Sequence, residues 1–123
     1  MSVLIVEDEI IIALDIKFTV ESMGFSISGI LSSGEESIAK IPDICPDIIL
    51  MDIKLSGQID GICAAKKIYD QYNIPSIYLT AYNDEKSLKK MKERDLFYFI
   101  IKPFSEYELS DTIKRTQDKF GLS

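Results

Sequence analysis

The chain has 123 residues, a formal net charge of −6, no histidine, and hydrophobic residues at 46% of its positions. This balance is typical of one globular domain, and the acidity argues against nucleic-acid binding, which requires a basic surface. Without histidine, Ser-His-Asp and Cys-His catalysis and histidine zinc sites are excluded. Because no apolar run is as long as a membrane span or has the form of a signal peptide, we expect a cytoplasmic protein.

Short apolar runs alternate along the chain with longer segments of helical periodicity. The runs predict strands at 3–6, 25–31, 48–51, 76–80 and 97–101. The segments between them predict helices at 9–23, 32–41, 59–72, 83–94 and 105–120. Five strands alternating with five helices indicate parallel β-α-β units, an α/β sheet with helices on both faces.

Local signals mark the ends of several of these segments. Gly24 and Gly121 stand just past helix ends, where glycine is common, and Ser105 with Glu108 forms a capping-box pattern. The stretch from Pro42 to Pro46 is expected to be a loop. The two cysteines, at 45 and 63, have no metal-ligand spacing, and we expect both to be small buried thiols.

Polar side chains stand where four of the five predicted strands end. The first strand is followed by Glu7 and Asp8, the third by Asp52, and the fourth and fifth end at Thr80 and Lys102. In an open parallel sheet the carboxyl ends of the strands form one edge, where ligands bind. We therefore expect three carboxylates, a hydroxyl and an ammonium to converge at this edge.

Carboxylates that lie this close together are tolerated where a divalent cation neutralises them, and Mg²⁺ prefers a few carboxylates plus water. Asp52 is then either a ligand or a nucleophile that takes a phosphoryl group, with Lys102 and Thr80 holding the phosphoryl oxygens. Each residue alone has a simpler explanation, such as helix capping or a solvated lysine, and Glu9 is expected only to stabilise the helix that follows it. Together, in this order, they favour a phosphoryl site.

With these residues in place, the sequence resembles the receiver domain of two-component response regulators, from Val3 to about Arg115. The resemblance rests on VLIVEDE, IILMDIKL, DGI, YLTAY and IIKPF, in that family's order and approximate spacing. It implies a flavodoxin-like (βα)5 fold, a doubly wound five-stranded parallel sheet of order 2-1-3-4-5. Residues 1–123 would form a single receiver domain, with no output domain in this chain.

The resemblance also implies a chemical role for the acidic residues. Asp52 would accept a phosphoryl group from a phosphohistidine on a sensor histidine kinase or phosphotransfer protein. Mg²⁺ would be bound by Glu7, Asp8, Asp52 and the main-chain carbonyl of Lys54. The chain would be a signalling switch rather than an enzyme, catalysing only its own phosphotransfer and slow autodephosphorylation.

On the phosphoryl side, the resemblance implies contacts from Lys102, Thr80 and the backbone N–H groups of Ile53 and Ala81. Movement of Thr80 toward the phosphate would let Phe99, at the family's aromatic switch position, turn inward. The face formed by helix 83–94, strand 97–101 and helix 105–120 would then change which partner it binds. A homodimer through that face is expected, without direct contact to nucleic acid or membrane.

Some positions depart from the family's pattern. The loop KLSGQIDG is one residue longer than usual, and Tyr98 stands where glycine is common, which predicts a more apolar face. Phe99 lacks the hydroxyl that many members carry. Lys54 and Tyr82 occupy positions that tune phosphate lifetime in the family, and we expect Tyr82 to shield the acyl phosphate from water.

Other readings stay open. A haloacid-dehalogenase-type phosphatase also uses a strand-end aspartate with Mg²⁺, but it needs an acid at position 54, which is lysine here. A flavodoxin-like binding module would want glycine and hydroxyl residues in the first loop, which reads VEDE. A degenerate receiver that only binds proteins would not need the acid, threonine and lysine set that this chain retains.

Overall fold

Five parallel strands form one sheet, in the order β2-β1-β3-β4-β5. The computed structural model describes residues 1–81, 83–94 and 96–122, without the side chains of 90–94. The strands are β1 (Ser2–Val6), β2 (Ser26–Leu31), β3 (Ile48–Asp52), β4 (Ser76–Ala81) and β5 (Phe99–Lys102). The helices are α1 (Ile10–Ser22), α2 (Gly34–Ile44), α3 (Gly61–Tyr72), α4 (Glu85–Arg94) and α5 (Glu106–Phe120). The predicted α/β class and strand order are confirmed.

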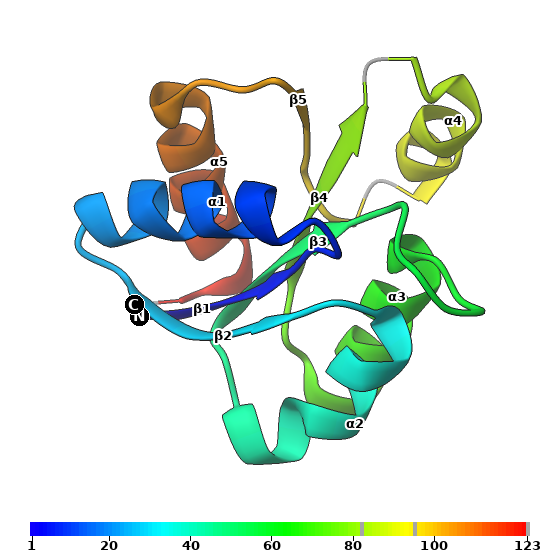
Figure 1. Ribbon diagram of the computed structural model, residues 1–123, viewed down its shortest axis with the longest axis horizontal. Coiled ribbons are helices and arrows are strands. Elements are labelled where there is room, and N and C mark those ends of the chain that lie inside the picture. The colour runs from blue at the N-terminus through cyan, green and yellow to red at the C-terminus, as the bar shows by residue number, and fades with distance from the viewer. Residues whose placement is uncertain (82, 95, 123) are drawn as a thin grey trace.

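Helices cover both faces of the sheet (Figure 1). α1 and α5 pack on one face, and α2 and α3 pack side by side on the other. Successive strand residues point to opposite faces, so each central strand supplies both cores. In β1, for example, Val3 and Ile5 belong to the core under α1 and α5, whereas Leu4 and Val6 belong to the core under α2 and α3.

Side-chain caps define the starts of several helices. Ser33, Asp60 and Ser105 each accept a hydrogen bond from the backbone N–H three residues further on. At α5 the Glu108 side chain also accepts from the Ser105 N–H, which completes the predicted capping box. α5 ends with Gly121 at φ +68°, the left-handed conformation that glycine adopts most easily.

Three local predictions were wrong. α2 continues through Pro42 to Ile44, because the Cys45 N–H reaches the Ile41 carbonyl at 2.8 Å and closes one more turn. The Cys45 thiol is exposed and Cys63 is half-buried, so neither is the buried thiol that we expect. β5 begins at Phe99 rather than at residue 97.

The late start of β5 follows from an aromatic cluster. The buried ring of Phe97 packs edge-on against Tyr69 and Tyr78, with centroids 5.3 and 5.7 Å apart, and lies 5.9 Å from Phe120. The ring of Tyr98 lies instead under two cations of α5, with Arg115 4.9 Å and Lys119 5.2 Å from its centroid. Around Tyr98 the surface is therefore more charged than the sequence predicts.

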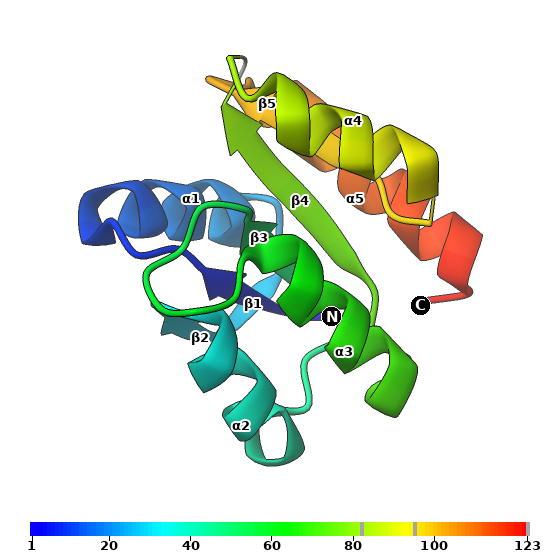
Figure 2. The ribbon, with the colours of Figure 1, turned by 90° about the vertical axis from the view of Figure 1, so that its right-hand side faces the viewer.

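The loop KLSGQIDG extends from β3 past the start of α2 before the chain enters α3 (Figure 2). Its Gln58 N–H donates to the Glu35 carboxylate of α2 at 2.8 Å, and its Ser56 hydroxyl donates to the Ser32 carbonyl at 3.2 Å. The Gln58 N–H, with smaller contributions from the N–H groups of Glu35 and Ile59, lowers the pKa of Glu35. The loop is thus held by α2 and by the residues just before it. Across the described helices, none is both long and apolar enough to cross a membrane.

Candidate functional site

The site residues lie at one edge of the sheet because their strands are parallel neighbours. Glu7 and Asp8 follow β1, Asp52 is the last residue of β3, Thr80 is the penultimate residue of β4, and Lys102 ends β5. These four strands are adjacent in the sheet, and β2, which contributes none of these residues, lies at its far edge. The expected convergence of these five side chains is therefore present.

Three of these side chains form one cluster of carboxylates. Oxygens of Glu7, Asp8 and Asp52 all lie within 4.8 Å of one another. Glu7 and Asp52 are only 2% and 6% exposed, whereas Asp8 is exposed. Burying two adjacent carboxylates is costly unless a cation neutralises them. Hard carboxylate oxygens at this spacing, with Asp8 open to water, suit the coordination that Mg²⁺ prefers.

Lys102 supplies one cation to this cluster. Its ammonium lies 3.0 Å from Asp52 Oδ2 and 3.3 Å from Glu7 Oε1. Burial alone would lower the pKa of Lys102, but hydrogen bonding and attraction to Asp52 and Glu7 outweigh it and raise the pKa. Burial, followed by hydrogen bonding and repulsion from Asp52, raises the pKa of Glu7 to about 8 despite Lys102. One ammonium is too little charge for two buried carboxylates.

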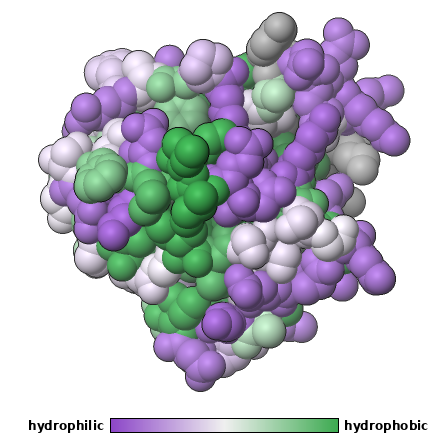
Figure 3. Space-filling model, viewed as in Figure 1, coloured by the Kyte–Doolittle hydropathy of each residue, from purple (hydrophilic) through white to green (hydrophobic). Residues whose placement is uncertain are grey.

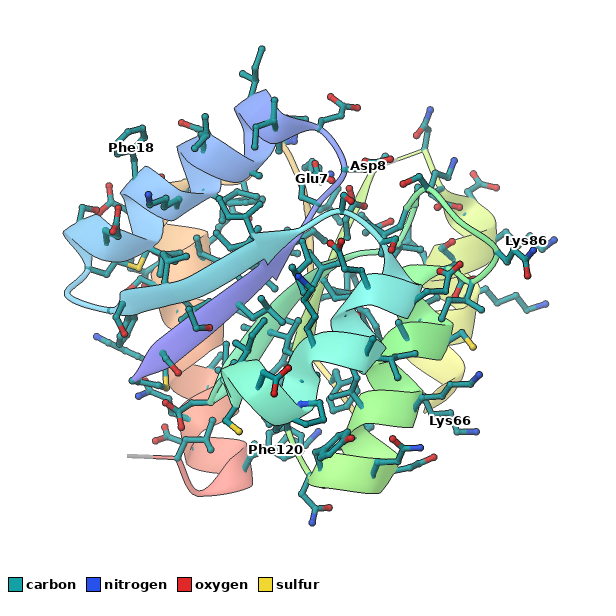
Figure 4. The ribbon with its side chains drawn as sticks, turned by 60° about the horizontal axis from the view of Figure 1, so that its bottom comes forward. Glu7, Asp8, Phe18, Lys66, Lys86 and Phe120 are labelled. Atoms are coloured by element: carbon teal, nitrogen blue, oxygen red, sulfur yellow. The ribbon has the colours of Figure 1, made fainter. Side chains whose placement is uncertain are left out.

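A cleft of about 350 Å³ opens over these residues. Asp52, Thr80 and Lys102 line it, together with Asp8, Glu9, Ile53, Lys54, Ala81 and Asp84. Glu9, which we expect only to stabilise α1, makes no capping bond there and faces this cleft as well. Figure 4 shows Glu7 and Asp8 together at the end of β1, where they meet the loops that follow the neighbouring strands.

The backbone around Asp52 corrects one expectation. The Ile53 N–H donates to the Leu79 carbonyl at 3.1 Å as part of the sheet, so it is already occupied. The Lys54 N–H instead donates to Asp52 Oδ1 at 3.2 Å. The backbone donor beside Asp52 is therefore the Lys54 N–H and not the Ile53 N–H. Sequence spacing cannot show which of two consecutive N–H groups turns toward a side chain.

Thr80 and Phe99 lie on the neighbouring strands β4 and β5. The Thr80 side chain is buried, and its hydroxyl donates over a long 3.5 Å to the Ala81 carbonyl. Phe99 is half-buried against the core and pairs in register with Tyr78, two residues before Thr80. The expectation for Tyr82 falls outside the described residues.

Gly61 is a site residue that spacing alone does not explain. It begins α3, and its N–H donates to the Ile53 carbonyl at 2.8 Å. A Cβ at this position would lie 2.0 Å from the Asp52 carbonyl oxygen and 2.9 Å from the Ile53 Cα. Glycine is thus required because the start of α3 touches the backbone that carries Asp52. In the sequence the only signal is the DGI segment.

An open α/β sheet with this acidic edge defines a class, the receiver domains, and comparisons with known proteins agree. The sequence model of the response regulator receiver domain matches residues 3–114. The chain is 32% identical to the response regulator DctR of Halalkalibacterium halodurans over 120 residues, covering 96% of this chain and 52% of that protein. It is 30% identical over 118 residues to the transcriptional regulatory protein PdtaR of Mycobacterium tuberculosis, covering 96% of this chain and 57% of that protein.

Solved structures agree with the sequence comparison. The signal receiver domain of a modulated diguanylate cyclase from Desulfovibrio desulfuricans is 33% identical with a TM-score of 0.89, covering 98% of this chain and 96% of that one. The receiver domain of PhyR from Erythrobacter litoralis is 29% identical with a TM-score of 0.80, covering 95% and 89%.

The chain belongs to the receiver domain family of response regulators. This is a signalling family of two-component systems that is not generally regarded as enzymatic. The chain spans 52% and 57% of the length of DctR and PdtaR.

Proposed function

We propose that Asp52 is the phosphoacceptor of a cytoplasmic two-component signalling switch, charged by a sensor histidine kinase or phosphotransfer protein. A carboxylate oxygen attacks phosphorus and forms an O–P bond while the P–N bond of the donor phosphohistidine breaks, and the imidazole nitrogen keeps that electron pair. The observation that carries this proposal is the single cluster at Asp52. Two further carboxylates lie within 4.8 Å of it, and one ammonium lies at 3.0 Å.

Glu7, Asp8 and Asp52 would hold Mg²⁺, with the Lys54 carbonyl as a further ligand. When bound, the ion supplies positive charge for the phosphoryl oxygens. On the other side of the cleft, Lys102 neutralises a phosphoryl oxygen, and Thr80 and the Ala81 N–H donate to others. The Lys54 N–H takes the place that the sequence assigns to Ile53, because it already faces Asp52.

Phosphorylation would act through Thr80. An acyl phosphate of about two negative charges is a much stronger acceptor than the Ala81 carbonyl at 3.5 Å, so the hydroxyl turns toward it. The space that Thr80 leaves lets the Phe99 ring move inward, which changes the face of α4, β5 and α5. This face would then select a partner or a second copy of the chain. Sedimentation with and without Mg²⁺ and beryllofluoride would test the homodimer.

The protein donor would dock over α1. Ile11 and Phe18, on the outward side of this helix, are 80% and 69% exposed, and Ile10 and Leu14 beside them are exposed as well. Figure 3 shows apolar side chains gathered over α1 and below it, and Figure 4 shows Phe18 pointing away from the molecule. The patch begins two residues after Asp8. A partner docked on this patch would lie beside the cleft that contains Asp52.

The proposal is tested by incubating the chain with acetyl phosphate and Mg²⁺ and measuring its intact mass. One phosphoryl adduct is expected in the wild type and in Asp118→Asn, an exposed acid of α5 outside the cleft. No adduct is expected in Asp52→Asn or when EDTA removes the metal. Steady release of phosphate with turnover would indicate a phosphatase, and absence of any adduct in the wild type would indicate a protein-binding module.

A further inference from the structure

Asp84 is a nearly buried acid at the rim of the cleft that the proposed function leaves without a role. Its side chain is 9% exposed, and it comes just before α4. One oxygen, Oδ1, accepts from the Ser87 N–H at 3.2 Å, as expected for a residue that caps a helix. Within the described part of the chain, no hydrogen-bond donor reaches the other oxygen, Oδ2, although it is buried. A helix cap needs one oxygen, so capping does not account for Oδ2.

The ion-pair partner of this second oxygen is Lys54. The Lys54 ammonium lies 3.9 Å from Asp84 Oδ2, and its side chain is 75% exposed. A pair this long and this open to water is weak, so Lys54 can leave it at little cost. Burial alone would raise the pKa of Asp84, but the hydrogen bonds from Ser87 together with attraction to Lys54 and Lys86 outweigh it and lower the pKa, so the carboxylate is charged at neutral pH.

Both members of this pair line the same cleft as Asp52. Lys54 and Asp84 line the cleft of the proposed phosphoacceptor, and both line a second cavity of about 470 Å³ between the β3–α3 loop and the start of α4. The backbone of Lys54 is already fixed at Asp52 by its N–H bond of 3.2 Å. The backbone of Lys54 is thus fixed beside Asp52, while its long, exposed side chain is able to turn.

We propose that Asp84 is a positioning residue that competes with the phosphoryl group on Asp52 for the Lys54 ammonium. Without phosphate, Asp84 holds Lys54 on the α4 side of the cleft. With about two negative charges on Asp52, Lys54 turns toward the phosphoryl oxygens and leaves Oδ2 unpaired. Asp84 thereby weakens phosphoryl binding. When Lys54 leaves, the residue that caps α4 loses its ion-pair partner. This inference rests on the proposed function and adds a residue to it.

A double-mutant cycle tests this competition, with beryllofluoride and Mg²⁺ as the phosphoryl analogue and titration calorimetry as the readout. Asp84→Asn keeps the cap, because asparagine caps helices as well as aspartate does. It should tighten beryllofluoride binding about two- to fivefold, because Lys54 no longer has this weak competing partner. Lys54→Met should weaken binding by a similar factor, and Asp84→Asn should then change it by less than about twofold.

Lys54→Arg serves as the conservative control, because it keeps the cation and should keep the coupling to Asp84. The inference would be overturned if Asp84→Asn alone left beryllofluoride binding unchanged. It would also be overturned if Asp84→Asn tightened binding as much in the Lys54→Met background as in the wild type. The second result would mean direct repulsion between Asp84 and the phosphoryl analogue. A wild-type chain that binds no beryllofluoride would overturn the proposed function itself, and this inference with it.

Discussion

Glu7 and Asp52 place two buried carboxylates at the ends of neighbouring strands, with Lys102 bridging them. In the metal-free chain Glu7 keeps a proton at neutral pH, because its pKa is raised from 4.5 to about 8, and this reduces the repulsion between the two carboxylates. A bound divalent cation would replace that proton. If these residues hold a metal ion, they link the stability of the chain to both pH and metal binding.

Between about pH 5 and pH 8 we expect the metal-free wild type to lose stability as the pH rises. In this range the folded chain holds a proton on Glu7 that the unfolded chain has released, so the free energy of unfolding falls, by at most about 1.4 kcal/mol per pH unit. The decline should level off above the folded pKa. Urea unfolding in EDTA measures it, and Glu7→Gln should flatten it. The chain has no histidine to mask the effect, so an unchanged slope in Glu7→Gln would contradict the assignment.

Gly61→Ala should disturb both fold and site. The new methyl group would lie 2.0 Å from the Asp52 carbonyl oxygen, so α3 or the end of β3 must move. We expect a loss of about 2 kcal/mol or more and reduced phosphoryl uptake from acetyl phosphate. Gly24→Ala is the matched control, because Gly24 has φ +91° and open space around it. It should cost roughly 1 kcal/mol and leave uptake unchanged; equal uptake in both variants would refute the role of Gly61.

At the scale of elements, the strands and their ends could be predicted, and with them most of the site. A run of apolar residues that stops at an acid, as at Val6–Glu7, marks a strand end by itself, and parallel pairing then brings such ends together. The misplaced boundaries depend on contacts far apart in sequence. Phe97 lies outside β5 because Tyr69 and Phe120 pack against it. The ion pair of Asp84 with Lys54, which comes from another loop, left no local pattern to detect.

Pro42→Ala should stabilise α2. Proline at this position lacks the N–H that would bond the Ile38 carbonyl, and its side chain is exposed, so little packing would be lost. We expect a gain of about 1 kcal/mol or more, reduced by the greater freedom of alanine in the unfolded chain. Chemical denaturation measures the change. Lys40→Ala, an exposed substitution in the same helix, should stay within about 0.5 kcal/mol. A destabilised Pro42→Ala would mean that proline fixes the end of α2.

For the molecule as a whole, metal binding should appear as global stability. If the acidic cluster holds Mg²⁺ only in the folded chain, a concentration of about 100 times Kd adds about 2.7 kcal/mol. Thermal unfolding with and without MgCl₂ measures this gain. Asp8→Asn should abolish most of this gain in stability, because Asp8 belongs to the acidic cluster. Asp8 is exposed, so its replacement should not disturb the buried core.

Asp118→Asn makes the same change in net charge on an exposed part of α5 and separates ion screening from specific binding. It should keep the full gain in stability. An equal gain in Asp8→Asn and Asp118→Asn would show that Mg²⁺ only screens the negative charge of the chain.

The residues proposed to hold the metal ion and the phosphoryl group lie at the edge of the sheet where the strands end, so the turns that lead into the strands lie away from this site. Those turns include Gly24, with nothing around it that a side chain would meet, and Asn73, which closes α3 in the left-handed conformation. A fluorescent dye or a short affinity tag attached there could report on the chain or immobilise it. The cleft, α1 and α4 would stay open to a donor protein.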